Sequence, residues 1–359
     1  METMEKTAGT TTASTSSDVL LEVRGLKMHF PIVRGIFGSS KGWVKAVDDV
    51  SFDVARGETL GLVGESGCGK TTVGRSIVRA YKPTGGIINY YGIGKEPVNL
   101  AEVEESELKA YRQDIRMIFQ DPYSSLNPRM PVFEIVGEPL RNLFSMSRSE
   151  MEDRVREALV RVGLRPEYIR RYPHAFSGGE RQRIGIARAL VTNPKLVIAD
   201  EAVSALDVSV RAQVLNLLEN LRKDLNLTYL FVSHDLSVIR YICDRVVVMY
   251  VGKVVESAPV NDLYSTPKHP YTEALMSAVP IQNPALRSLE TRIRLKGEIA
   301  DPSNPPSGCY FHPRCRFAQE RCKVEAPELR PIGKDRMVAC HFAEDLSLKG
   351  AVMGHAAIL

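Results

Sequence analysis

One stretch decides the fold of this chain: Thr59-Leu60-Gly61-Leu62-Val63-Gly64-Glu65-Ser66-Gly67-Cys68-Gly69-Lys70-Thr71. It opens with a short apolar run that is typical of a buried strand, and a glycine-rich segment ends that run. Apolar residues then recur at helical spacing over residues 72–80. Glycines in such a loop let backbone N–H groups turn inward toward phosphate oxygens. The stretch therefore predicts a strand, a phosphate-binding loop and a helix, whereas a chance glycine turn would need no buried strand before it.

The residues of this loop predict a nucleotide site that also holds magnesium. We expect Lys70 to reach the β- and γ-phosphates and the hydroxyl of Thr71 to bind Mg²⁺. The N-terminus of the following helix adds a favourable dipole. Cys68 is interpreted as an inert loop residue. The expected ATP-binding residues of the loop are Gly64, Glu65, Ser66, Gly67, Cys68, Gly69, Lys70, Thr71 and Thr72.

A second apolar run, residues 196–199, ends at the acid pair Asp200 and Glu201. We expect Asp200 to hold magnesium through water and Glu201 to polarise the water that attacks the nucleotide. Acid pairs at strand ends are also common as solvated turns. The phosphate loop upstream favours the catalytic interpretation.

Strand and helix patterns alternate around these motifs. The expected strands are 20–23, 50–54 and 228–232, and the expected helices are 150–162, 181–191 and 210–225. This alternation predicts a parallel α/β architecture, in which ligands bind at the carboxyl ends of the strands. Gly64, Asp200 and His234 all fall at such ends. A charged helical stretch over residues 130–172 predicts a helical subdomain whose apolar faces pack locally.

The composition is that of an ordinary soluble globular protein. The chain has 359 residues, 44% of them apolar and 25% charged, with a formal net charge of +4. The small charge gives no support for nucleic-acid binding. No apolar run reaches membrane-spanning length, and the Thr/Ser-rich N-terminus lacks the apolar segment of a signal peptide. We therefore expect a cytosolic chain, and a membrane process would require spanning helices from other subunits.

A further motif, Phe176-Ser177-Gly178-Gly179-Glu180, lies between the loop and the acid pair. It resembles the signature motif of the ATP-binding-cassette family, although leucine and glutamine are more usual than Phe176 and Glu180. The resemblance implies that Ser177, Gly178, Gly179 and Glu180, at the start of a helix, bind the γ-phosphate of ATP held by an opposing subunit. A plain Ser-Gly-Gly linker is the alternative, and the spacing from the other motifs favours the signature.

Further segments match this family in order along the chain. Gln120 resembles the glutamine of the Q-loop, which implies contacts with magnesium, with the attacking water and with a membrane subunit. His234 resembles the switch histidine, which implies a contact with the γ-phosphate. The residues Ser204, Ala205, Leu206 and Asp207 resemble the D-loop. Trp43 is the candidate to stack on adenine, and Phe30 and Phe37 compete with it.

The resemblance implies a P-loop NTPase fold of the cassette type. Its expected parts are a mixed α/β sheet core, an antiparallel β edge, a helical subdomain and a small C-terminal appendage with cysteines. The expected boundaries are a disordered tail over 1–18, a nucleotide-binding domain over 19–265 with its helical subdomain at about 125–180, a C-terminal region over 266–345 and a tail over 346–359.

The single copy of each motif implies half of a two-subunit ATPase in which two ATP molecules lie between the subunits. Closure of this dimer would supply a mechanical stroke. The implied partners are a homologous ATPase subunit or a second copy, two membrane-spanning permease subunits, and indirectly an extracytoplasmic solute-binding protein. The implied location is the cytoplasmic face of the cell (inner) membrane. A soluble cassette ATPase of translation or repair would usually carry two cassettes or a coiled coil, and a degenerate binding module would lack the intact acids.

The segment Lys268-His269-Pro270-Tyr271 resembles the one that follows the ATPase domain in dipeptide and oligopeptide importers. Physically it predicts a turn that starts a helix at Pro270. Nickel, glutathione, opine and oligosaccharide importers use similar ATPase subunits, so the cargo stays open among these and peptides.

Four of the six cysteines gather late in the chain: Cys309, Cys315, Cys322 and Cys340. A cluster in a reducing compartment favours a metal centre over disulfides. The resemblance implies a [4Fe-4S] cluster as a structural staple. Zinc and free thiols remain alternatives, although the short Cys-x-x-Cys spacing of zinc ribbons is missing. Cys243 lies in an apolar stretch and is interpreted as a core residue.

Overall fold

The computed structural model describes residues 18–33, 40–94, 96–121, 123–279 and 292–351. Apart from Asp18, the predicted N-terminal tail lies outside the described residues. Phe37 and residues 352–359 of the predicted C-terminal tail also lie outside them.

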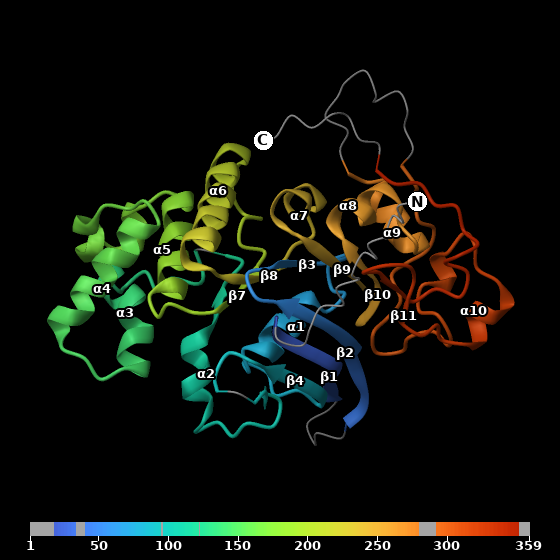
Figure 1. Ribbon diagram of the computed structural model, residues 1–359, viewed down its shortest axis with the longest axis horizontal. Coiled ribbons are helices and arrows are strands. Elements are labelled where there is room, and N and C mark those ends of the chain that lie inside the picture. The colour runs from blue at the N-terminus through green and yellow to red at the C-terminus, as the bar shows by residue number, and fades with distance from the viewer. Residues whose placement is uncertain (1–17, 34–39, 95, 122, 280–291, 352–359) are drawn as a thin grey trace, which may run out of the picture.

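An eight-stranded sheet forms the centre of the described part of the chain (Figure 1). Its strand order is β11-β12-β10-β9-β3-β8-β7-β6. The neighbours from β9 to β6 run parallel, and β10, β12 and β11 extend the sheet antiparallel. The bounds are β3 Thr59–Val63, β6 Ile115–Ile118, β7 Leu196–Asp200, β8 Thr228–Val232, β9 Arg245–Tyr250, β10 Lys253–Pro259, β11 Arg330–Pro331 and β12 Met337–Val338. The predicted parallel α/β core is confirmed, with a mixed edge.

Strand β7 shows why the central strands have continuous apolar sequences. Val197 and Ala199 pack into one hydrophobic core, whereas Leu196 and Ile198 pack into the other. Successive side chains of a strand point to opposite faces, so a sheet that is covered on both faces needs apolar residues at every position.

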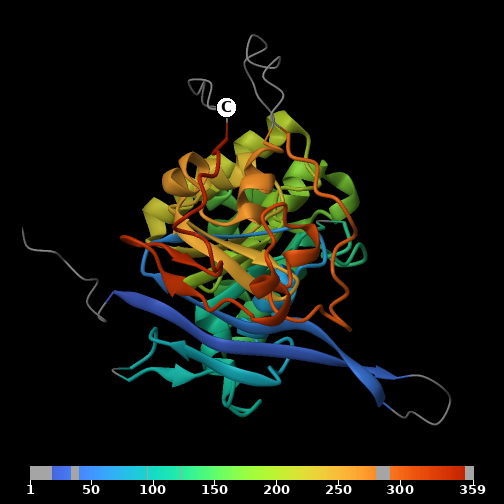
Figure 2. The same ribbon diagram turned by 90° about the vertical axis from the view of Figure 1, so that its right-hand side faces the viewer.

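A second, antiparallel sheet has the order β2-β1-β4-β5. Figure 2 shows its two long strands, β1 and β2, crossing below the central sheet. The bounds are β1 Val19–Val33, β2 Ser40–Ala55, β4 Gly85–Tyr90 and β5 Val98–Asn99. The predicted strands 20–23 and 50–54 are only fragments of β1 and β2. The apolar/polar alternation does not continue along the whole strands, because register shifts interrupt the pairing of β1 and β2 at several points.

Helix α1, Lys70–Ile77, lies next to the central sheet, on the side where the second sheet lies (Figure 1). Its buried residues Val73 and Ile77 join a core cluster with Leu60 and Leu62 of β3. The predicted helix over 72–80 is confirmed, but it begins and ends earlier. It ends early because Arg79 has a φ of 57°, which no α-helix accommodates.

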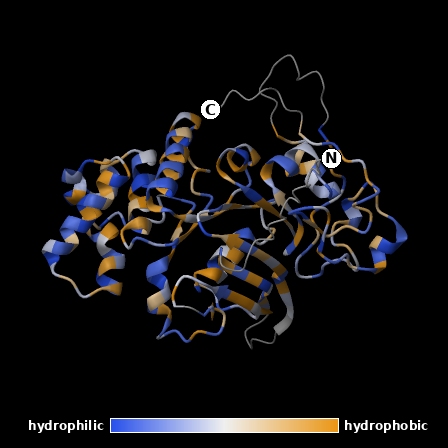
Figure 3. Cartoon of the chain, viewed as in Figure 1, coloured by the Kyte–Doolittle hydropathy of each residue, from blue (hydrophilic) through white to orange (hydrophobic). Residues whose placement is uncertain are grey.

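The predicted helical subdomain is confirmed. It consists of α3 Val132–Leu143, α4 Arg148–Arg161, the 3₁₀ helices η1 Pro166–Arg170 and η2 Pro173–Ala175, and α5 Gly178–Leu190. Ser147 and Glu150 form a capping box that starts α4. Val155 and Leu159 on the same helix are fully buried, and Figure 3 shows apolar residues on the sides of these helices that face one another. Helices α2 Leu108–Asp114, α6 Val208–Leu225 and α7 Leu236–Ile242 also lie near the sheet.

The C-terminal region packs against the β10 edge of the central sheet (Figure 1). It contains α9 Pro270–Met276, η4 His312–Arg314 and α10 Glu320–Val324, and it follows α8 Val260–Ser265. Pro270 is the first residue of α9 and His269 caps it, which confirms the predicted turn and helix. Within the described residues, no helix combines the length and the apolar character needed to cross a bilayer.

Candidate nucleotide-hydrolysis site

The predicted phosphate loop connects the carboxyl end of β3 to the N-terminus of α1. Gly64 and Gly69 have φ values of 152° and 105°, and a Cβ at either would lie 2.2 Å from a backbone oxygen, that of Met249 or Ala46. Only glycine fits at these two points, because each combines a positive φ with a close approach of another strand. The loop is thereby held between β2 and β9.

Lys70 lies folded back over this loop. Its ammonium group donates to the carbonyl oxygens of Gly64, at 2.8 Å, and of Glu65, at 3.0 Å. The Lys70 side chain is buried, so these bonds satisfy a charge that would otherwise be costly. The ammonium group is positioned to exchange carbonyl partners for phosphate oxygens.

Thr71 and Asp200 are brought together as the sequence predicts for a magnesium site. The Thr71 hydroxyl donates to a carboxylate oxygen of Asp200 at 2.9 Å. Burial raises the pKa of Asp200 above its usual value, and the hydrogen bond from Thr71 offsets part of this rise. A hydroxyl and a carboxylate are oxygen ligands of the kind that Mg²⁺ prefers. These two residues therefore fit the role assigned to them.

Glu201 lies at the centre of a hydrogen-bonded triad. One carboxylate oxygen lies 2.9 Å from Nδ1 of His234, and the other accepts from the amide of Gln120 at 2.8 Å. Glu201 has a φ of 47°, an unusual conformation for a residue with a side chain, so the surrounding structure must impose it. This strained turn follows β7 and places the carboxylate beside residues from the segments after β8 and after β6.

Most of the predicted loop residues meet Gln120, Glu201 and His234 at one cavity of about 660 Å³, whereas Asp200 lines the neighbouring cleft. The strands β9, β3, β8 and β7 are neighbours in the sheet, so their carboxyl ends share one edge. The cavity is lined by Ala46, Gly64, Glu65, Ser66, Gly67, Gly69, Lys70, Thr71, Thr72, Gln120, Glu201, His234, Leu236 and Leu275. Cys68 lies in the loop with a buried side chain, and burial raises the pKa of its thiol.

The signature residues lie at the start of α5. The Ser177 hydroxyl accepts from the backbone N–H of Glu180, and the Glu180 carboxylate accepts from the backbone N–H of Ser177 at 2.9 Å. Ser177 is exposed, and among the described residues none of this motif lines the phosphate-loop cavity. Their use by an opposing subunit stays a prediction.

The D-loop residues follow directly on the strained turn. The Ser204 hydroxyl donates to the carbonyl oxygen of Glu201 at 3.0 Å. Leu206 is buried, whereas Ala205 and Asp207 are exposed. The segment thus anchors the turn on one side and presents a surface on the other.

Trp43 lies in β2 and is 50% exposed. It is not among the described residues that line the phosphate-loop cavity, to which β2 contributes Ala46. Its stacking on adenine stays a prediction. Phe30, the competing aromatic residue in β1, instead packs edge-on against Tyr81 at 5.4 Å between ring centroids.

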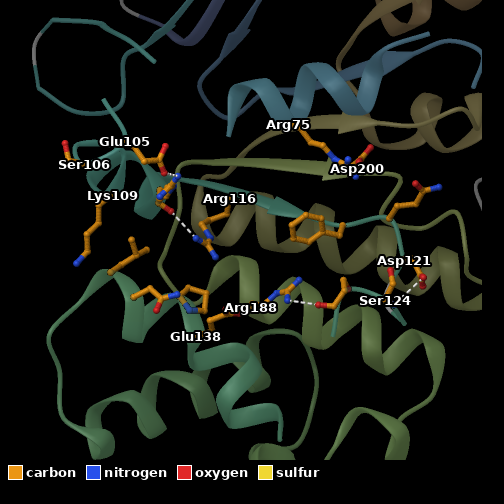
Figure 4. Close-up of a pocket in the computed structure, with 17 residues that line it drawn as sticks. Arg75, Glu105, Ser106, Lys109, Arg116, Asp121, Ser124, Glu138, Arg188 and Asp200 are labelled. Atoms are coloured by element: carbon orange, nitrogen blue, oxygen red, sulfur yellow. Dashed lines mark hydrogen bonds and ion pairs between the residues drawn. The ribbon is translucent and has the colours of Figure 1, made fainter. Parts of the chain in front are cut away.

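A larger cleft of about 990 Å³ opens beside the phosphate-loop cavity, between α2, α3 and α5 (Figure 4). Gln120 lines both spaces. Burial and the neighbouring Arg188 lower the pKa of Arg116 to about 10. The charged residues of the cleft are Arg75, Glu105, Lys109, Arg112, Arg116, Asp121, Glu138, Arg188 and Asp200.

The four late cysteines line one small cavity of about 20 Å³ with His269, His312 and His341. Burial and the neighbouring thiols raise the pKa of Cys309 to about 12 and of Cys315 to about 11. Across the described residues, no group of three or more His, Cys, Asp or Glu side chains has an arrangement that could hold a metal ion. The four thiols line the same cavity, whereas the predicted [4Fe-4S] cluster stays a prediction. Cys243 is buried in the core, as predicted.

Two contacts to the phosphate loop were missed by sequence reasoning. Arg314 forms an ion pair with Glu65, and the Tyr271 hydroxyl accepts from the backbone N–H of Glu65. Both residues belong to the C-terminal region, which had been assigned no part in the site. Tyr271 belongs to the Lys268-His269-Pro270-Tyr271 segment, but no local pattern connects it or Arg314 to the phosphate loop, because each is far from the loop along the chain.

Comparisons with known proteins agree with this geometry. Residues 47–204 match the ABC transporter family, and residues 255–322 match the oligopeptide/dipeptide transporter C-terminal region. The oligopeptide transport ATP-binding protein AppF of Bacillus subtilis (strain 168) is 52% identical over 91% of this chain and 98% of its own. OppF, the oligopeptide transport ATP-binding protein of Escherichia coli (strain K12), is 51% identical over 87% of this chain and 92% of its own.

Solved structures show the same fold. The ATP-binding cassette MJ0796, in a dimeric post-hydrolysis state bound to ADP and Pi, superposes with a TM-score of 0.58 at 27% identity, covering 67% of this chain and 99% of its own. CbiO1 from Clostridium perfringens superposes with a TM-score of 0.57 at 26% identity, covering 69% of this chain and 91% of its own. The chain therefore belongs to the ATP-binding proteins of the ABC transporter family, in the branch that carries the oligopeptide/dipeptide transporter C-terminal region.

Proposed function

We propose that this chain binds and hydrolyses ATP to drive the import of di- or oligopeptides, as the ATPase subunit of a membrane transport complex. The observation that carries the proposal is the Glu201 carboxylate, held by His234 and Gln120 at the edge of the cavity that Lys70 and Thr71 line. The names of the relatives AppF and OppF support peptides as the cargo. Nickel, glutathione, opine and oligosaccharides are the alternative cargoes.

The residues of the cavity divide the work of hydrolysis. The glycine loop and the N-terminus of α1 hold the phosphates, and Lys70 moves from its loop carbonyls to phosphate oxygens. Glu201 orients the attacking water and takes its proton, while His234 holds the carboxylate in place. Thr71, Asp200 and Gln120 would hold Mg²⁺, which neutralises charge on the phosphates when it is bound.

The second half of the site comes from another ATPase subunit. Ser177, Gly178, Gly179 and Glu180 do not line this chain's own cavity. Ser177 is exposed and the other three are half-buried at the N-terminus of α5, which favours an anion. The dimeric MJ0796 cassette supports this arrangement. The partner is a homologous subunit or a second copy of this chain.

The membrane partners would dock at the cleft drawn in Figure 4. Gln120 lines this cleft and also bonds to Glu201, so a segment seated there reaches the catalytic carboxylate through one side chain. We place the subunit at the cytoplasmic face of the cell (inner) membrane, with two permease subunits and, indirectly, an extracytoplasmic solute-binding protein.

Transport by the reconstituted complex tests this function. In proteoliposomes that hold the permease subunits, we expect peptide-loaded solute-binding protein to raise ATP turnover and to drive uptake of labelled peptide. Lys70→Ala in this chain should abolish both, because it removes the phosphate-binding ammonium group. Uptake of nickel, glutathione, an opine or an oligosaccharide without peptide uptake would show that peptides are not the cargo. It would leave the proposed ATPase role unchanged.

The cysteine cavity is proposed to hold a [4Fe-4S] cluster that staples the C-terminal region. Four thiols meet in one place with no carboxylate among them, and soft sulfur ligands suit iron-sulfur or zinc. As the side chains lie, the cavity has room for about one water-sized group. A four-iron cluster therefore requires the thiols to move outward. A single zinc ion also requires the side chains to rearrange, because among the described residues no three of them lie in an arrangement that could hold a metal ion.

Cys309→Ser tests the cluster by spectroscopy. The full chain, purified without oxygen, should be brown and contain iron and sulfide, and Cys309→Ser should lose the brown absorbance because one of four ligands is gone. Cys243→Ala is the matched control, since this buried thiol lies in the core away from the cavity and its loss should leave the colour unchanged. Zinc without iron in elemental analysis would overturn the cluster assignment.

A further inference from the structure

Glu65 is the second residue of the phosphate loop, and its side chain lines the phosphate-loop cavity. A carboxylate at this place is electrostatically adverse, because the cavity must accept a triphosphate of the same sign. Its backbone carbonyl accepts from Lys70 and from the backbone N–H of Cys68. Glu65 therefore connects the loop backbone, the phosphate-binding lysine and a negative charge in a single residue.

Arg314 of the C-terminal region neutralises this carboxylate with a two-pronged ion pair. Its two terminal nitrogens donate to the two carboxylate oxygens at 2.7 and 3.1 Å. The Arg314 side chain is only 7% exposed, and its guanidinium group lies 5.8 Å from the ring centroid of Tyr250. A planar guanidinium held by two parallel bonds has one orientation, so the pair fixes position as well as charge.

A buried aromatic layer holds Arg314 and the loop in register. Tyr271 packs against Tyr250 at 4.8 Å and against Phe311 at 5.4 Å between ring centroids. The Tyr271 hydroxyl then accepts from the backbone N–H of Glu65 at 2.9 Å. The C-terminal region thus bonds to both the backbone and the side chain of Glu65.

We propose that Arg314 is a positioning residue for ATP hydrolysis, which holds the Glu65 end of the phosphate loop and cancels the charge that would repel the triphosphate. This role rests on the proposed nucleotide site. It makes the C-terminal region a part of the ATPase site, connected to it across 249 positions of the chain.

Arg314→Met tests the role in the full-length protein. The variant leaves the Glu65 carboxylate unpaired in the cavity, so we expect KM for ATP to rise about tenfold. We expect kcat to change by less than about twofold, because Glu201 and His234 are untouched. Affinity for adenosine should not change, since the repulsion acts on phosphate charge.

A second substitution separates charge from mere packing. In Glu65→Gln/Arg314→Met the repelling carboxylate is gone as well, and we expect KM to return to within about threefold of the unmodified protein. Glu65→Gln alone removes the carboxylate and keeps the Arg314 cation beside the triphosphate, so it should lower KM for ATP. Equal KM in Arg314→Met and the unmodified protein, or equal impairment in the single Arg314 variant and the double variant, would overturn the role.

Arg316→Met is the matched control. Arg316, two residues along the same segment, pairs with the buried carboxylate of Glu273: one terminal nitrogen donates to both oxygens, at 2.8 and 2.7 Å, and this pair does not line the phosphate-loop cavity. We expect Arg316→Met to lower thermal stability and to leave KM for ATP unchanged, and a tenfold rise of KM in this variant would overturn a specific role for Arg314.

Lys70→Ala distinguishes failure of the Arg314 role from failure of the proposed nucleotide site. If Lys70→Ala binds ATP normally, the proposed nucleotide site itself is wrong. Should Arg314→Met not fold, the expectation for Glu65→Gln still stands, and a tenfold rise of KM there would refute the charge argument.

Discussion

Glu201→Gln is expected to slow ATP hydrolysis by about 10²- to 10⁴-fold, the range that a positioned general base contributes. The carboxylate takes a proton from the attacking water, and an amide at the same position cannot. The shape of the site should survive, because glutamine keeps the length of the side chain and one oxygen for bonds to Gln120 or His234. We therefore expect ATP binding to remain within about threefold of the unmodified protein.

The same variant should hold the nucleotide-bound dimer closed, because the dimer opens only after hydrolysis. The measurement is single-turnover hydrolysis of radiolabelled ATP together with light scattering of the full chain, with its ATPase partner where a second copy does not suffice. Asp262→Asn is the matched control: it removes an acid from α8, away from the lining of the cavity, and should leave turnover unchanged. Normal turnover in Glu201→Gln would falsify the general-base assignment.

The nucleotide site could be predicted from sequence because its chemistry lies in short contiguous segments. The glycines around Lys70 are required by backbone geometry, and Asp200 and His234 each end an apolar run that stands out as a buried strand. The order of the central strands then brings those ends to one edge, as expected of a parallel sheet. Local pattern and fold rule agree here, so the predicted fold is confirmed and these residues lie together, while their roles in hydrolysis stay predictions.

Other features depend on contacts that no local pattern encodes. The pair of Arg314 and Glu65 joins residues 249 positions apart, and an arginine between a proline and a cysteine has no distinctive sequence signal. The sequence predicts only fragments of the long strands β1 and β2, because bulges shift the alternation that marks a strand. The strained φ of Glu201 likewise follows from packing after β7, and glycine would have been the expected residue at such an angle.

Gly178→Asp is expected to reduce ATP turnover of the assembled ATPase pair by about 10²- to 10³-fold. Gly178 is the first residue of α5, and the proposed arrangement aims its backbone at the γ-phosphate bound by the opposing subunit. An aspartate there places a negative charge against the phosphate, where the helix N-terminus otherwise attracts it. The substitution should fold, because among the described residues a Cβ at Gly178 meets the Tyr123 hydroxyl alone, at an ordinary 3.6 Å.

The choice of position decides whether this test is informative. A Cβ at the neighbouring Gly179 would lie 2.5 Å from Val210, so a loss of activity there could come from misfolding. Gly185→Asp is the matched control. Gly185 lies two turns along α5, no atom of the described part of the chain lies within 4 Å of its added Cβ, and the variant should keep turnover. ATP affinity of the isolated chain should be the same in Gly178→Asp as in the unmodified protein, because its own cavity is lined by other residues. Loss of ATP affinity in the isolated chain would place the motif at its own phosphate loop, and full turnover in the pair would remove it from the site altogether.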